Sequence, residues 1–189
     1  MKKTLLTIAV VGLTALSSFG QGSILFKNFG SGVNGSFVAG GVAVFDVDGT
    51  TKLPAGTGFD FQLWGGAQGT SQGSLTAVST PINGVGSGLF GSPQYTVTGV
   101  AIGATGTFQV RVWNTAGGTL NTYAAALGAG AATGKSALID VVLADPANLT
   151  AGSQPILLGL TSITLAVPEP STFALLGLGA AGLLIRRRK

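Results

Sequence analysis

The chain has 189 residues, with no cysteine, no histidine and only 8% charged residues. These absences exclude disulfides and remove both the commonest general base and the commonest metal ligand. The formal net charge is +4, but six of the ten cations lie in the first three and the last four residues. Residues 23–166 hold four cations against five aspartates, a net charge of −1 that offers no basic patch to nucleic acid.

The first 22 residues have the pattern of a secretory signal peptide. Lys2 and Lys3 form a cationic start, residues 5–16 form an apolar stretch, and Ser18 and Gly20 are small residues before a cleavage site. We expect a signal peptide over residues 1–20, with cleavage between Gly20 and Gln21. The partners would then be the export translocase and signal peptidase; an uncleaved anchor is the alternative.

The part between residues 21 and 166 is long enough for one compact domain. Apolar residues recur there with a period of two, which predicts strands. Glycine pairs and Asp48-Gly49 mark bends and turns. Residues 123–133 suit either a short helix or a loop. The predicted strands cover residues 23–27, 37–47, 59–64, 75–80, 94–100, 108–113, 136–143 and 156–165.

Turn-punctuated short strands of this number favour an all-β fold, a single antiparallel β-sandwich with Greek-key or jelly-roll-like connections. The strands at 59–64 and 108–113 both read Phe-Gln and end in tryptophan. If they pair, Trp64 and Trp113 should lie near the same rim or face of the sheet. The alternative is that aromatic residues merely favour strands.

Several motifs invite a chemical interpretation. Glycines at 30, 32 and 35 and at 86, 88 and 91 match the dinucleotide-binding spacing, but no helix is predicted after either, and 32 glycines make chance matches expected. Asp46 and Asp48 resemble the start of a calcium loop without its later carboxylate, so a hairpin turn is favoured. We predict no cofactor and no metal site.

Catalytic groups are scarce. Asp60 and Asp140 could pair as glycosidase carboxylates, although each is expected on the wet face of its strand. Arg111 lies between valines and should face solvent or pair with an aspartate. We predict that the protein is not an enzyme.

The C-terminus consists of three adjoining parts: a Pro-Glu-Pro tripeptide, an uncharged run over residues 171–185 and a cationic end. The prolines favour extended backbone before them. Fifteen apolar residues span only about 22 Å of a hydrocarbon layer roughly 30 Å thick, which suits temporary residence in a membrane. The sorting motif is Val167, Pro168, Glu169 and Pro170; the membrane anchor uses Phe173, Leu175, Leu176, Leu178, Leu183, Leu184 and Ile185; the basic tail is Arg186, Arg187, Arg188 and Lys189.

This order of parts over residues 167–189 resembles the PEP-CTERM sorting signal of exopolysaccharide-producing Gram-negative bacteria. The resemblance implies that an exosortase recognises the tripeptide and removes the anchor at the inner membrane. A plain C-terminal anchor is the alternative. The segments Phe61–Trp64, Arg111–Asn114 and 134–137 are similar to a verrucomicrobial-type group of exported PEP-CTERM proteins, which implies no activity.

We therefore expect a non-enzymatic exported protein of the cell surface or extracellular matrix, anchored transiently in the inner membrane. The alternative is a carbohydrate-binding module acting on exopolysaccharide through exposed rings of Trp64, Trp113, Tyr95 or Tyr123. A hydrolase is the third hypothesis.

Overall fold

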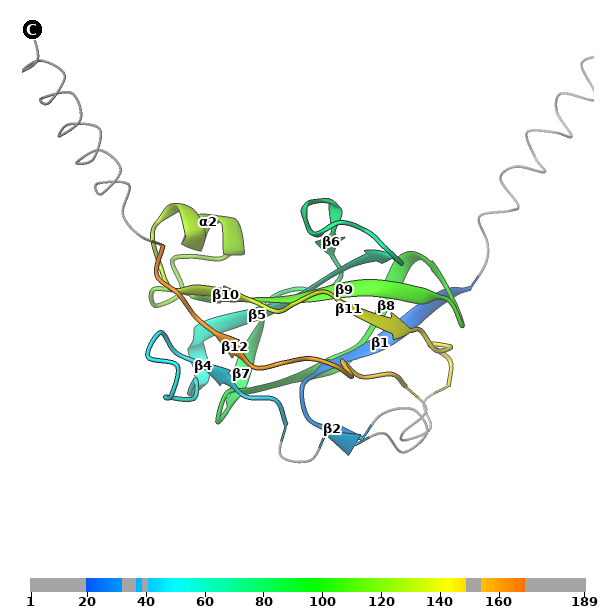
Figure 1. Ribbon diagram of the computed structural model, residues 1–189, viewed down its shortest axis with the longest axis horizontal. Helices are drawn as coiled ribbons and strands as arrows, with labels where there is room; N and C mark the ends of the chain where they lie inside the picture. Colours follow the sequence, from blue (N-terminus) through cyan, green and yellow to red (C-terminus); the bar gives the residue numbers. More distant parts are fainter. Residues whose placement is uncertain (1–19, 32–36, 39–40, 149–153, 169–189) are drawn as a thin grey trace, which may run out of the picture.

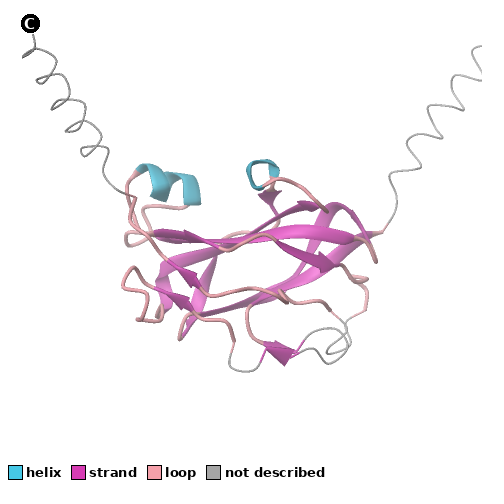
Figure 2. Cartoon of the chain, viewed as in Figure 1, coloured by secondary structure: helices cyan, strands magenta, loops and turns pink. Residues whose placement is uncertain are grey.

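The computed structural model describes residues 20–31, 37–38, 41–148 and 154–168. Figures 1 and 2 show a body built almost entirely of strands, with α2 and η2 as the helical elements of the described ranges. The elements are β1 (Gln21–Lys27), β2 (Gly30–Ser31), β3 (Phe37–Val38), β4 (Val44–Phe45), β5 (Ala55–Ala67), the 3-10 turn η2 (Gln72–Ser74), β6 (Thr76–Ala77), β7 (Ile82–Gly86), β8 (Leu89–Ala101), β9 (Thr105–Asn114), α2 (Tyr123–Gly128), β10 (Thr133–Lys135), β11 (Ile139–Val142) and β12 (Ile163–Thr164).

The main sheet has eight strands in the order β1-β8-β7-β5-β9-β10, with β11 also beside β9 and β6 beside β5. All its pairs are antiparallel. The sheet bends round the core, because Ser23 of β1 forms a bridge with Ala144, just after β11, and the Leu25 amide donates to the Pro155 carbonyl. The parallel pair β4–β12 and the antiparallel pair β2–β3 complete the body. The fold is all-β and sandwich-like, as predicted.

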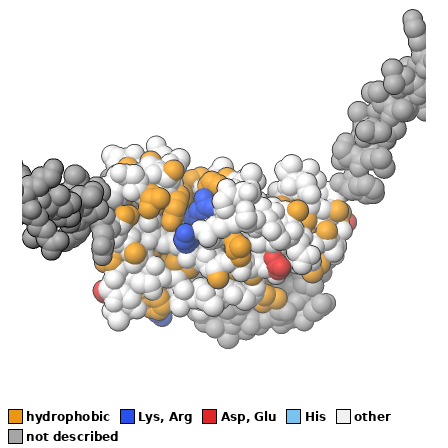
Figure 3. All heavy atoms as spheres, turned by 45° about the horizontal axis from the view of Figure 1, so that its top comes forward, with side chains coloured by type: hydrophobic (Ala, Val, Ile, Leu, Met, Phe, Trp, Pro, Cys, Tyr) orange, Lys and Arg blue, Asp and Glu red, His pale blue; other side chains and the backbone are white. Residues whose placement is uncertain are grey.

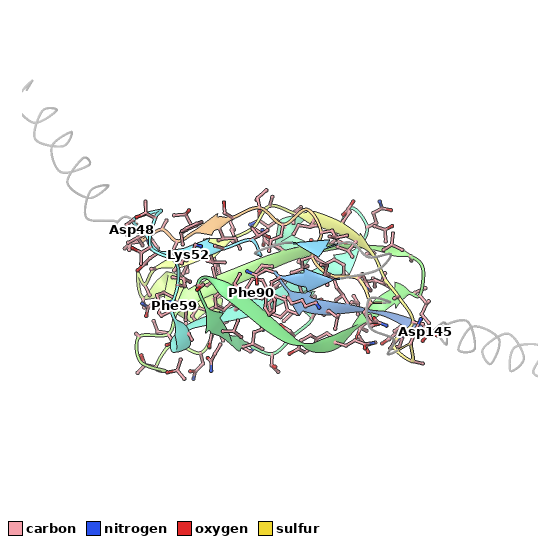
Figure 4. All side chains as sticks on the ribbon, turned by 90° about the horizontal axis from the view of Figure 1, so that it is seen from below. Asp48, Lys52, Phe59, Phe90 and Asp145 are labelled. Carbon is pink, nitrogen blue, oxygen red and sulfur yellow. The ribbon has the colours of Figure 1, made fainter. Side chains whose placement is uncertain are left out.

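Alternation along β5 separates the two faces of the sheet. In β5, Phe59, Phe61 and Leu63 are buried, while Asp60 and the other residues between them point to the opposite face. Phe61 and Phe90 stack at 4.9 Å between ring centroids, and Figure 4 shows Phe90 near the middle of the body. This apolar face holds the sheet against the β4–β12 layer.

Two apolar stretches form less strand than the sequence predicts. Residues 37–47 give only β3 and β4, and Gly41, between them, has a φ of +71°. Residues 156–165 give only β12, although most of their large apolar side chains are buried. The segment covers the core without pairing along most of its length. A continuous apolar sequence of this kind predicts that its side chains are buried, but it does not predict that its backbone pairs as a strand.

Three strands escape the sequence prediction. β2 lies outside the predicted strands, at glycines expected to break the chain, and it pairs with β3. β7 contains Asn83 and two glycines, which are poor strand formers, and it forms through its neighbours β5 and β8. The β7–β8 hairpin turns at Ser87 and Gly88, whose φ values of +52° and +70° define a two-residue type I′ turn. The three-residue β10 likewise depends on its pairing with β9.

The ambiguous segment at 123–133 resolves into a helix followed by a strand. α2 begins after Thr122, whose side-chain oxygen accepts a hydrogen bond from the Ala125 amide at 3.1 Å. It lies above the sheet in Figure 1, as does the η2–β6 segment farther along.

Within the described ranges, no helix is long and apolar enough to cross a membrane. The predicted anchor over 171–185 and the predicted signal peptide up to residue 19 lie outside the described residues.

Candidate functional site

The face of the sheet opposite the core carries polar and aromatic side chains from its two central strands. β5 and β9 pair so that Gln62 lies opposite Arg111 and Trp64 lies opposite Gln109. Directly opposite residues project to the same side of an antiparallel sheet, with Cβ atoms about 4.5–5.5 Å apart. The four side chains therefore form one cluster on this face.

Arg111 is the centre of this cluster. Its guanidinium carbon lies 3.7 Å from the ring centroid of Trp64 and 5.6 Å from that of Tyr123. Its Nε donates to Gln109 Oε1 at 3.1 Å, and its Nη2 donates to the Gln72 carbonyl at 3.2 Å. Partial burial lowers the pKa of Arg111, an effect that Tyr123 opposes. The guanidinium stays charged at neutral pH and is held by four contacts.

The neighbours of Arg111 are themselves fixed. Trp64 Nε1 donates to Gln62 Oε1 at 3.0 Å, and Gln62 Nε2 donates to the Ser79 carbonyl at 2.9 Å. Gln109 Nε2 donates to the Ser136 carbonyl at 2.9 Å. The side-chain oxygens of Gln62 and Gln109 thus orient Trp64 and Arg111, and their side-chain nitrogens are bound to backbone carbonyls. These bonds preorganise the cluster.

Lys135 adds a second cation. It lies directly opposite Arg111 on β10 and is exposed. Neither cation forms an ion pair within the part of the chain that the structure describes. Figure 3 shows cationic atoms gathered near the middle of this face. We call this surface the arginine face; it consists of Gln62, Trp64, Gln109, Arg111, Tyr123 and Lys135.

Asp60 is the nearest carboxylate on this face by register. It lies opposite Trp113, two residues along β9 from Arg111. Partial burial raises the pKa of Asp60, and it has no hydrogen-bond partner among the described residues. Arg111 is thus held by two aromatic rings, the Gln109 side chain and the Gln72 carbonyl. Pairing with an aspartate, one of the two arrangements expected from the sequence, is not seen among the described residues.

Only some of the four aromatic residues named from the sequence fit an exposed platform. Trp64 and Trp113 share a face, as expected from pairing of their strands. However, Trp113 is fully buried, and its Nε1 donates to the Leu120 carbonyl at 2.9 Å. Tyr95 packs against the core, 6.4 Å from the ring of Phe26. Trp64 and Tyr123 remain partly exposed, beside Arg111.

The predicted carboxylate pair does not come together. Asp60 and Asp140 lie on the same face, but their partners on β9, Trp113 and Thr107, are six residues apart. At about 3.4 Å per residue this separation is roughly 20 Å, more than twice the reach of a glycosidase pair. Asp140 instead accepts a hydrogen bond from Thr107 Oγ1 at 2.6 Å.

The remaining motifs belong to turns. Asp48 Oδ1 accepts hydrogen bonds from the amides of Thr50 and Thr51, at 2.9 and 2.8 Å, which closes the turn after β4. In the described ranges no group of three or more acidic or other metal-binding residues gathers. Gly86 ends β7 and Gly88 lies in the β7–β8 hairpin turn, so neither opens a helix. The glycine motif that begins at Gly30 lies partly outside the described residues.

Sequence reasoning singled out Arg111, Trp64 and Tyr123 but missed Gln62, Gln109, Gln72 and Lys135. A usable signal was present for two of them. Gln62 stands two residues before Trp64, and Gln109 two residues before Arg111, so alternation places each glutamine beside the side chain that it orients. Gln72 and Lys135 come from other segments, and their position depends on the tertiary fold.

The predicted sorting motif begins directly after the last bridge of the folded body. Ala166 and Thr133 exchange two backbone hydrogen bonds, of 2.8 and 2.9 Å, and the Leu165 amide donates to the Phe45 carbonyl at 3.0 Å. Only Val167 separates this last bridge from Pro168. The motif therefore follows the folded body directly.

Comparison with known families identifies a PEP-CTERM protein-sorting motif over residues 166–189. The motif implies that the chain is an exported protein sorted to the cell envelope, with an exosortase as its processing partner. No curated protein and no solved structure matches the chain.

Proposed function

We propose that this is a non-enzymatic protein of the cell surface or extracellular matrix, delivered by its PEP-CTERM signal. Residues 1–20 act as a signal peptide for the translocase and signal peptidase, residues 21–166 form the passenger domain, and residues 167–189 form the sorting signal. The run at 171–185 holds the chain in the inner membrane until the exosortase acts. The observation that carries the proposal is the sorting motif at residues 166–189.

The test follows the mass of the chain in a bacterium that has an exosortase and in the same strain without it. We expect the surface form to lack the cationic tail only when the exosortase is present. Glu169→Gln should leave the tail attached. Asp145→Asn, which removes one negative charge from an exposed loop, is the matched control and should be processed normally. A surface form that keeps Arg186–Lys189 in the presence of the enzyme would refute the proposal.

A second candidate function is carbohydrate binding, and the arginine face favours it. Partly exposed aromatic rings flanked by amide side chains can pack against sugar rings and bond their hydroxyl groups. Trp64 and Tyr123 supply the rings here, and both lie beside Arg111. Trp64→Ala should abolish retention of the full-length protein on exopolysaccharide from its host, whereas Leu127→Ala, an exposed apolar change in α2, should not. The verrucomicrobial-type grouping of the passenger stays a prediction.

A further inference from the structure

We propose that the arginine face binds the carboxylate groups of an acidic polysaccharide, such as a polymer of hexuronic acid. This inference rests on the carbohydrate-binding candidate above and adds the charge class of the sugar and the residues that read it. Arg111 and Lys135 would contact the carboxylates, and Trp64 and Tyr123 would pack against the sugar rings.

The first argument is that Arg111 has unused donors in a fixed position. A guanidinium carries five N–H donors, and two of those on Arg111 have acceptors, Gln109 and Gln72. The other three have none among the described residues. Contact with the ring of Trp64 restricts the guanidinium plane. A preorganised, partly desolvated guanidinium is suited to charge-assisted hydrogen bonds with a carboxylate.

The second argument is the placement of charge. Residues 21–166 contain four cations, and two of them, Arg111 and Lys135, are directly opposite each other on adjacent strands. Like charges in this arrangement repel and destabilise the sheet unless a counter-charge is near. Neither has a carboxylate partner among the described residues. The pair therefore favours an anionic occupant.

The third argument concerns the kind of anion. Around the two cations the face offers amide groups and two partly exposed rings, Trp64 and Tyr123, rather than a broad apolar surface. Insertion into a bilayer needs such an apolar surface. A hydrated chain that carries both hydroxyl and carboxylate groups matches amides, rings and cations together. This combination points to an acidic sugar polymer.

Asp60 supplies an internal check. It lies on the same face, on the diagonal from Arg111, and would repel a bound carboxylate. Removing its charge as Asp60→Asn should therefore strengthen binding to an acidic polymer and leave binding to a neutral polymer unchanged.

The experiment uses the full-length protein in a polyoxyethylene detergent, which contributes no sugar. Its mobility is measured in native gels that contain polygalacturonate or dextran. We expect polygalacturonate to retard the protein and dextran to leave its mobility unchanged. The retardation should disappear when the gel contains about 0.5 M salt. Lys135→Gln should weaken the affinity for polygalacturonate about tenfold. Lys52→Gln is the matched control, because it removes one exposed cation from a turn outside the face. Arg111→Gln should weaken binding further, provided that thermal unfolding shows it to be folded.

The outcomes separate the two claims. Equal binding to dextran and polygalacturonate would overturn the acidic-sugar inference and leave carbohydrate binding in place. Binding to neither polymer would overturn both. If Lys52→Gln and Lys135→Gln weaken binding equally, binding depends on the net charge of the protein and not on the arginine face, which would overturn the inference. Binding to phosphatidylglycerol vesicles but not to polygalacturonate would assign the face to lipid and also overturn it.

Discussion

At the scale of single residues, Asn28 connects three segments through one buried amide. Its Oδ1 accepts from the Phe90 amide at 2.9 Å, and its Nδ2 donates to the carbonyls of Val42 and Gly88, at 2.7 and 3.2 Å. Asn28→Ala leaves these backbone groups without the partner, so we expect a loss of about 2–4 kcal/mol in the free energy of unfolding. Asn83→Ala, at an exposed position, should change it by less than about 0.5 kcal/mol. Urea unfolding measures both, and equal effects would contradict this role.

Asp48 makes the stability of the turn depend on pH. Hydrogen bonds from the side chain and amide of Thr51 and from the Thr50 amide lower its pKa from 3.8 to about 2. Because the folded-state pKa is depressed, the ionised carboxylate stabilises the fold above pH 3.8, and this contribution is lost as the pH falls towards 2. Asp48→Ala should thus be less stable than the original protein at pH 6, with the difference shrinking between pH 4 and pH 2.

Unfolding of the two proteins in a pH series tests this expectation. Asp48→Asn is the control, since it keeps an oxygen acceptor for the two amides but cannot ionise. A stability difference between the original protein and Asp48→Ala that stays constant from pH 6 to pH 2 would show that the charge has no part in the turn.

Part of the arginine face could be predicted from the sequence. Alternation identified Arg111 as a charge within a strong strand and Trp64 as a surface candidate. The stacking of the two, and the arrival of Tyr123 from a helix, depend on pairing between β5 and β9 and on the packing of α2. Sequence periodicity places a side chain on a face but does not select its neighbours.

At the scale of elements, the contact of β10 with β12 depends on a missing side chain. A Cβ on Gly134 would lie 2.9 Å from Ile163 Cγ2 and 3.1 Å from Val112 Cγ1. Gly134→Ala should therefore push the two elements apart and cost about 1–3 kcal/mol. Gly128→Ala in α2 meets nothing within 4 Å and should be neutral or stabilising by up to about 1 kcal/mol. Thermal unfolding compares the two, and equal midpoints would contradict a tight β10–β12 contact.

The same elements explain why strand prediction succeeded only in part. The predicted strands at 59–64, 94–100 and 108–113 were recognised from short alternating stretches, and they lie within β5, β8 and β9. β12 has two strand residues within a longer apolar segment, and β7 contains glycines, so neither leaves a clear period of two. Elements whose pairing comes from the tertiary fold cannot be read from local sequence.

At the scale of the whole molecule, the described body begins and ends at opposite ends (Figure 1). The chain leaves at the end that carries the Asp48 turn, and Asp145 lies at the other end (Figure 4). The bridge between Ala166 and Thr133 fixes the last paired residue at this exit. Only Val167 stands between this paired residue and Pro168, the first proline of the motif. An exosortase that reads the motif must therefore approach the folded passenger closely.

This closeness predicts that the passenger slows its own processing. Inserting six glycine and serine residues between Ala166 and Val167 adds roughly 13 Å of root-mean-square reach, so we expect tail removal to become several-fold faster in a pulse–chase experiment. The control is the same insertion between Ile102 and Gly103, in the exposed β8–β9 turn at the opposite end of β9 from the exit. Equal rates for both insertions would mean that the enzyme reaches the motif without hindrance from the fold. A slower rate for the exit insertion would instead mean that the enzyme uses the adjacent passenger surface, since only a required contact is weakened by added distance.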